Sequence, residues 1–244
     1  MNTTSASRAD SATQNTAAAK VLVWDAPVRV FHWLMVLSFA GAYLTAESER
    51  WRLAHVTLGY TMAALVLFRL VWGLIGTRHA RFASFVRGPA TVKRYLAALL
   101  RGKPEHYTGH NPAGALAIIA LLGAALIVTA AGWATYNELG GEWLEELHEA
   151  AANAMLALVG VHVGGVVVSS LLHKENLVGA MISGRKKTRP GDAIKRAWRG
   201  VAALLLAGVL GFWWWQWQQA PAAGNADQTA TQVQRHASNT TKDA

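Results

Sequence analysis

Five long apolar segments dominate the chain and restrict it to a membrane protein built from helices. They run from about Val28 to Ala46, Leu53 to Gly76, Pro112 to Tyr136, Trp143 to Leu172 and Val201 to Trp217. Each is close to the roughly 20 residues that a helix needs to cross the hydrocarbon layer. Of the 244 residues, 52% are hydrophobic and 15% are charged, which is typical of membrane proteins. We therefore expect an all-α membrane protein with a four-helix transmembrane bundle and a fifth, C-terminal transmembrane helix.

Lysine and arginine residues concentrate in two of the connections. The basic segments are residues 77–111 and 174–199, whereas residues 137–147 contain Glu138, Glu142, Glu145 and Glu146 and no lysine or arginine. The positive-inside rule places both basic segments, and with them the N-terminus, in the cytoplasm. The net charge of +9 is then a signal of membrane topology, and it does not call for nucleic acid as a partner. Within the first basic segment, residues 89–102 predict a short amphipathic helix at the membrane surface.

The chain contains no cysteine. This excludes disulfides, cysteine-ligated iron–sulfur clusters and a covalently attached c-type haem. The first 20 residues are polar and alanine-rich and lack the apolar core of a cleavable signal peptide. We expect residues 1–20 and the polar tail, residues 218–244, to be disordered.

Two histidines lie 14 positions apart in the fourth apolar segment, His148 and His162. On an α-helix, 14 residues rise roughly 21 Å and return to within about 40° of the starting direction, so both imidazoles point the same way at different membrane depths. One helix can therefore supply a ligand to each of two stacked haems. Metal-binding groups within a bilayer are expensive and generally functional.

Two further histidines, His32 and His55, lie near the starts of the first two apolar segments. The expected topology pairs His55 with His148 and His32 with His162, around two b-type haems. A single histidine near a helix end is usually interfacial, but four at complementary depths favour ligation. Two imidazoles per iron leave no open position, which favours electron transfer over oxygen binding.

Other residues in these segments have two interpretations. Gly59, one turn after His55, can make room for a porphyrin or can serve helix packing. Arg69 can bind a haem propionate or extend its side chain to the interface. His173 is interpreted as an interfacial or quinone-site residue, and His79, His106, His110 and His236 are expected to be solvated.

Several motifs resemble the bacterial membrane-bound di-haem cytochrome b family, which contains cytochrome b561 and the cytochrome b subunits of nickel–iron hydrogenases. The resemblance covers about residues 20 to 185 and rests on VWDAPVRVFHW (23–33), HVTLGY (55–60), FRLVWGLIGTRHARF (68–82), GHNPAGAL (109–116) and LHEAAANAMLALVGVHVGGV (147–166). The axial histidines of the family fall on His32, His55, His148 and His162. The resemblance implies electron exchange with membrane quinone and with a redox partner.

The expected organisation is a disordered segment (1–20), a di-haem cytochrome b transmembrane domain (21–185), a basic linker with the fifth helix (186–217) and a disordered tail (218–244). We expect electron transfer between the quinone pool and an outer-face partner, a c-type cytochrome or a hydrogenase, in the bacterial inner membrane. The alternatives are a hydrogenase cytochrome b subunit and a self-contained superoxide or quinol oxidoreductase. A non-redox metal transporter is less favoured, because no Asp or Glu lies mid-membrane beside the histidines. The sequence leaves open the oligomeric state and whether the chain is itself an enzyme, although an electron-transfer subunit is favoured.

Overall fold

The computed structural model describes residues 19–103 and 105–219. Within these residues, five helices are long and apolar enough to cross a membrane. They are α2 (Ala26–Thr45), α3 (Arg52–Ile75), α6 (Pro112–Tyr136), α7 (Glu142–His173) and α9 (Arg199–Gln218). The prediction of an all-α membrane protein with five such helices is confirmed, and each predicted end lies within two residues of the observed one.

Local sequence signals explain where these helices begin. The Asp25 carboxylate accepts a hydrogen bond from the Val28 amide (2.9 Å), and Pro27 lies in the first turn of α2. Asn111 caps α6 in the same way through the Gly114 amide (2.7 Å), with Pro112 as its first residue. A side-chain acceptor at the N-cap satisfies one of the free amides, and proline tolerates the first turn because it lacks an amide hydrogen.

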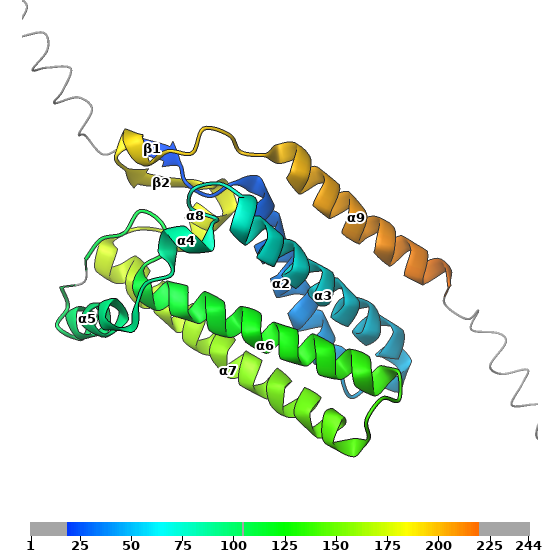
Figure 1. The fold of residues 1–244 in the computed structure, drawn as a ribbon. Helices are drawn as coiled ribbons and strands as arrows, with labels where there is room; N and C mark the ends of the chain where they lie inside the picture. The colour runs from blue at the N-terminus through cyan, green and yellow to red at the C-terminus, as the bar shows by residue number, and fades with distance from the viewer. Residues whose placement is uncertain (1–18, 104, 220–244) are drawn as a thin grey trace, which may run out of the picture. The chain divides into compact units, whose positions relative to one another are not determined.

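The bundle is built from two helical hairpins, α2–α3 and α6–α7, joined by packing of α3 against α6 (Figure 1). Its core includes Phe39 from α2, Met62 and Val66 from α3, Leu122 from α6 and Met155 from α7. Among the described residues, α2 and α7 do not form a closely packed helix pair. The side of the bundle between these two helices is therefore less tightly closed than the α3–α6 side.

One end of the bundle carries a group of short elements that we call the cap, made of residues 19–25, 77–103, 105–111 and 174–198. It contains β1 (Ala19–Leu22), α4 (Phe82–Phe85), α5 (Pro89–Leu100), α8 (Leu177–Ser183), β2 (Arg185–Thr188) and the 3₁₀ turn η2 (Pro190–Asp192). Strands β1 and β2 pair antiparallel, with Lys20 opposite Lys187. The sequence analysis anticipated α5 but not this sheet. Ala19 and Lys20, assigned to the N-terminal segment, belong to β1, and residues 1–18 lie outside the described residues.

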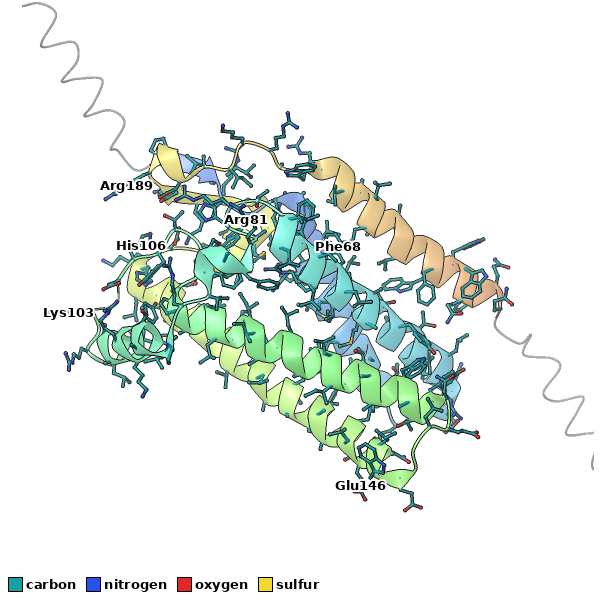
Figure 2. The ribbon with its side chains drawn as sticks, viewed as in Figure 1. Phe68, Arg81, Lys103, His106, Glu146 and Arg189 are labelled. Atoms are coloured by element: carbon teal, nitrogen blue, oxygen red, sulfur yellow. The ribbon has the colours of Figure 1, made fainter. Side chains whose placement is uncertain are left out.

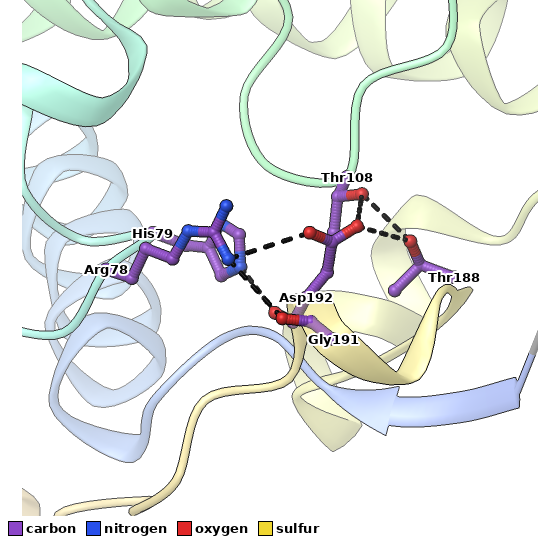
Figure 3. A network of polar contacts seen from close by, with 6 residues as sticks. All are labelled: Arg78, His79, Thr108, Thr188, Gly191 and Asp192. Carbon is purple, nitrogen blue, oxygen red and sulfur yellow. Dashed lines mark hydrogen bonds and ion pairs between the residues drawn. The ribbon is translucent and has the colours of Figure 1, made fainter. Parts of the chain in front are cut away.

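Polar contacts hold the cap together (Figure 3). Asp192 accepts a hydrogen bond from Thr108 (2.8 Å) and lies 3.7 Å from Arg78. The Thr108 hydrogen bond is the largest cause of a lowered pKa for the Asp192 carboxyl. The ring of His79 donates through Nε2 to the backbone carbonyl of Asp192 (2.8 Å). The Arg78 and His79 contacts join the loop after α3 to η2, over 100 residues later in the chain, and the Thr108 contact joins the segment before α6 to η2.

The two ends of the bundle differ in charge. Lys103, His106 and Arg189 lie at the cap, and Glu146 lies at the opposite end (Figure 2). We call the end that holds the α2–α3 and α6–α7 connections the loop end.

The described chain divides into two units at the Leu206–Ala207 junction within α9. In the second unit, the Phe212 and Trp215 rings lie 6.2 Å apart. Gln218, assigned to the disordered tail, is the last residue of α9, and residues 220–244 lie outside the described residues.

Candidate functional site

His55 and His148 face each other near the loop end. Their ring centres are 6.0 Å apart and the ring planes are inclined by 78°. His55 lies on α3 and its Nδ1 is 2.8 Å from the carbonyl oxygen of Ala42; His148 lies on α7 and its Nδ1 is 2.9 Å from that of Val128. Because a carbonyl can only accept, Nδ1 carries the proton in both rings, and Nε2 is left available as a metal ligand.

His32 and His162 form a second pair closer to the cap. His32 lies on α2 and interacts electrostatically with His162 on α7. The Nδ1 atom of His32 is buried and has no hydrogen-bond partner among the described residues. The structure thus brings His55 and His148 face to face and places His32 within electrostatic range of His162; each pair involves one helix of the α2–α3 hairpin and α7.

Arg69 is a buried cation on α3. Its side chain is 2% exposed, and both terminal nitrogens are buried without a hydrogen-bond partner among the described residues. The guanidinium lies 4.8 Å from the centre of the Phe82 ring and interacts electrostatically with Asp25. Arg69 therefore reaches the Phe82 ring of the cap while staying buried, and its free donors match an anionic group such as a carboxylate.

Two glycines differ in what surrounds them. A Cβ added at Gly59 would meet no atom within 4 Å, so no close helix contact explains this glycine. A Cβ added at Gly132 on α6 would lie 2.7 Å from the His148 ring. Gly132 was missed by the sequence analysis, because only the packing of α6 on α7 places it beside His148.

Two of the loop histidines are not solvated, contrary to the sequence prediction. His79 is 8% exposed. The His110 ring lies between Trp24 (4.5 Å) and Phe85 (4.6 Å), and its Nδ1 is buried without a partner among the described residues. Burial lowers the pKa of His110 to about 3, and the positive charge of Arg69 acts in the same direction. The motif GHNPAG is the sequence signal that could have indicated this burial. Asn111 and Pro112 start α6, so His110, the residue before them, is held against the end of the bundle.

His106 is solvated, as predicted, and His173 lies at the end of α7. His106 is exposed in the cap, and its ring lies 5.3 Å from that of half-buried His173 at the end of α7. His236 lies outside the described residues.

The His55–His148 pair fits haem iron. Histidine–metal bonds are about 2 Å long, so two imidazoles bound to one ion have ring centres about 6 Å apart, as observed for His55 and His148. Proton-locked Nδ1 atoms hold both rings in one tautomer. The unpartnered Arg69 nitrogens could hold an anionic substituent such as a haem propionate.

Comparison with known families agrees with this geometry. The model of the family described as prokaryotic cytochrome b561 matches residues 23–184. The chain belongs to this family. It is accordingly a multi-pass membrane b-type cytochrome that functions in electron transfer with haem b as its cofactor. The resemblance drawn from the sequence motifs is confirmed.

Two relatives of this cytochrome have names that refer to a nickel–iron hydrogenase. A protein of Bradyrhizobium diazoefficiens named probable Ni/Fe-hydrogenase B-type cytochrome subunit is 26% identical over 69% of this chain and 87% of its own length. A protein of the same name from Azotobacter vinelandii is 28% identical over 67% of this chain and 87% of its own length. No solved structure gives a significant match.

Proposed function

We propose that this cytochrome holds two haems b and transfers electrons between membrane quinone and a redox partner at the loop end. The observation that carries the proposal is the His55–His148 pair, with ring centres 6.0 Å apart and both Nδ1 atoms within hydrogen-bond distance of backbone carbonyls. Haem b bound there would supply one-electron redox chemistry. His55 and His148 would both ligate its iron, which favours electron transfer over oxygen binding.

His32 and His162 would bind the second haem. Support comes from the buried, unpartnered Nδ1 of His32 and from Arg69, whose cation is buried with no hydrogen-bond partner among the described residues. Leaving such a charge unpaired costs several kcal/mol, and a propionate would remove that cost. The two ligands on α7 lie roughly 21 Å apart along the helix axis, a spacing that suits electron transfer across the membrane.

The charges at the two ends support an orientation. The basic cap would face the cytoplasm, as would the N-terminus, and the acidic loop end would face the outside of the inner membrane. Quinone would react near the pair His32 and His162, where Arg69 and His173 supply polar groups. The relatives' names favour a nickel–iron hydrogenase as the partner at the loop end.

Haem counting tests this proposal. We expect purified, fully loaded protein to show a b-type reduced-minus-oxidised spectrum and two haems per chain by pyridine haemochrome quantitation. Absence of a b-type spectrum would reject haem binding altogether. A value of one haem per chain in fully loaded protein would reject the two-site arrangement.

A further inference from the structure

A small polar cavity lies in the cap at the C-terminal end of α7. Its volume is 40 Å³, which is enough for water, since a water molecule needs about 10–15 Å³ of such space. Its lining consists mostly of side chains that can donate or accept a proton: His106, Tyr107, Asn111, Ser169, His173, Glu175 and Lys186. None of these residues is needed for the two histidine pairs.

These side chains become more buried from one end of the cavity to the other. His106 is exposed at the surface of the cap, as Figure 2 shows, and its ring is 5.3 Å from half-buried His173. His173 in turn interacts electrostatically with Glu175 and Lys186. Glu175 and Lys186 form a 3.1 Å ion pair with side-chain exposures of 15% and 4%. The second carboxylate oxygen of Glu175 is buried and has no partner among the described residues.

Of the two α7 residues that line the cavity, Ser169 is the nearer to His162 along the helix. Ser169 is 8% exposed, and Tyr95 of α5 is 3% exposed. Along α7, Ser169 lies seven residues after His162 and His173 lies eleven after it. Both offsets return to within about 20° of the same helix face, and Ser169 is only about 10 Å along the axis from His162. Ser169 and His173, which line the cavity, therefore lie on the same face of α7 as His162.

We propose that this cavity is the proton-exchange site of the cytochrome, with His173 and Glu175 relaying protons between solvent at His106 and quinone at the cap-end pair. This rests on the quinone reaction of the proposed function. Oxidation of one quinol to quinone releases two electrons and two protons. Haem b held by the histidine pairs would accept the two electrons one at a time, and Glu175 and His173 would pass the two protons to solvent. Quinone reduction would reverse both flows.

Stability alone is a weak explanation for this cluster. A buried ion pair often contributes little net stability, because removing two charges from water costs about as much as their attraction returns. Here the pair lies beside two histidines, a titratable type suited to proton transfer near neutral pH, and one carboxylate oxygen remains free. A proton carrier needs such a free acceptor, whereas a purely structural ion pair does not.

The test follows haem reduction by a short-chain ubiquinol after rapid mixing with the full-length, haem-loaded cytochrome. Positioned proton-transfer groups contribute about 10²- to 10⁴-fold to rates, so His173→Ala and Glu175→Gln are each expected to slow haem reduction by quinol by about 100-fold. Reduction by dithionite, which needs no quinol proton, should keep its wild-type rate. Added imidazole should restore a large part of the rate of His173→Ala, and Glu175→Asp should retain more rate than Glu175→Gln.

The matched control is Lys174→Gln, because Lys174 is exposed and lies between the two relay residues but does not line the cavity. It should react with quinol at the wild-type rate.

If His173→Ala loses its haem spectrum, the variant His106→Ala, at an exposed residue, gives the same test, with an expected slowing of about tenfold. If quinol reduces the haem of His173→Ala and Glu175→Gln at a rate within twofold of wild type, the proton site is overturned but the quinone function is not. A wild-type protein that quinol does not reduce would instead overturn the quinone function, and the proton site with it.

Discussion

At the scale of single residues, backbone carbonyls determine how the His55 and His148 rings are presented. The carbonyl oxygens of Ala42 and Val128 fix the protonated nitrogen of each ring, so ligand strength depends on helix packing as well as on the histidine itself. Gly132 acts at the same scale, because any larger residue would collide with the His148 ring.

Removing single histidines should therefore give a pairwise pattern. His55→Ala and His148→Ala should each lose the same haem, because a slot with one ligand missing binds its cofactor weakly. His32→Ala and His162→Ala should lose the other. Haem content and the reduced-minus-oxidised spectrum measure this, with exposed His106→Ala as the control that keeps both haems. If His32→Ala gives the same spectrum as His55→Ala, the pairing is wrong.

At the scale of elements, Asp25 fastens the start of α2 to the end of α3. Its carboxylate is 1% exposed, and besides capping α2 it accepts hydrogen bonds from Trp72 Nε1 (3.1 Å) and Thr77 (2.6 Å). The same two helices carry His32 and Arg69. Asp25 thus fixes the helix of His32 relative to the helix of Arg69.

Breaking this connection should destabilise the bundle. Hydrogen bonds to a buried charged group contribute about 1.5–3 kcal/mol each, so Asp25→Ala is expected to lower the free energy of unfolding by about 3 kcal/mol or more. For a chain of this size that corresponds to roughly 6–12 °C in Tm. Thermal unfolding of the purified protein measures the loss, with exposed Glu47→Gln as the control. An unchanged Tm for Asp25→Ala would show that the carboxylate does not connect the helices.

At the scale of the whole molecule, burial of His110 makes the stability of the fold depend on pH. The folded-state pKa of His110 is about 3, below the unfolded value of about 6.5. Between these values the unfolded chain binds more protons, so stability falls as pH decreases from about 6.5 toward 3, by up to about 1.4 kcal/mol per pH unit. Above about pH 7.5 His110 contributes almost no slope, because it is neutral in both states.

The variant His110→Phe should flatten this dependence, since the apolar ring can fill the space between Trp24 and Phe85 without titrating. Melting temperatures between pH 7 and 4 give the comparison, with His106→Phe as the control that keeps the wild-type slope. A His110→Phe protein with an unchanged slope would assign the acid sensitivity to other groups.

The segregation of charge between the two ends also acts at this scale. The acidic loop end is suited to steer a basic redox partner toward His148, because exposed charges attract over about 8 Å at physiological ionic strength. We expect electron transfer from the reduced cytochrome to a basic soluble cytochrome c to slow about tenfold between low and physiological salt. Replacing Glu138, Glu142, Glu145 and Glu146 by glutamine should remove most of this salt dependence and leave the haem spectrum unchanged. Unaltered kinetics in the quadruple variant would make the loop a structural connection only.

Local signals in the sequence were sufficient for the helices and for the histidine spacing. Helix length, the Asp25 and Asn111 caps and the 14-residue interval on α7 depend on neighbouring residues, so hydropathy and helical geometry predicted them. The topology of alternating helices then predicted the pairing of His55 with His148, whose rings face each other in the structure.

Tertiary structure alone decided the burial of polar groups and the pairing of distant segments. The pairing of β1 with β2, the enclosure of His110 by Trp24 and Phe85, and the inward position of Arg69 depend on residues far apart in the chain. Lys186 illustrates the difference: its sequence context marks a basic loop, yet its ammonium group is buried against Glu175. A charge in a loop is paired or solvated according to which segments fold over it, and that information is not contained in its neighbours along the chain.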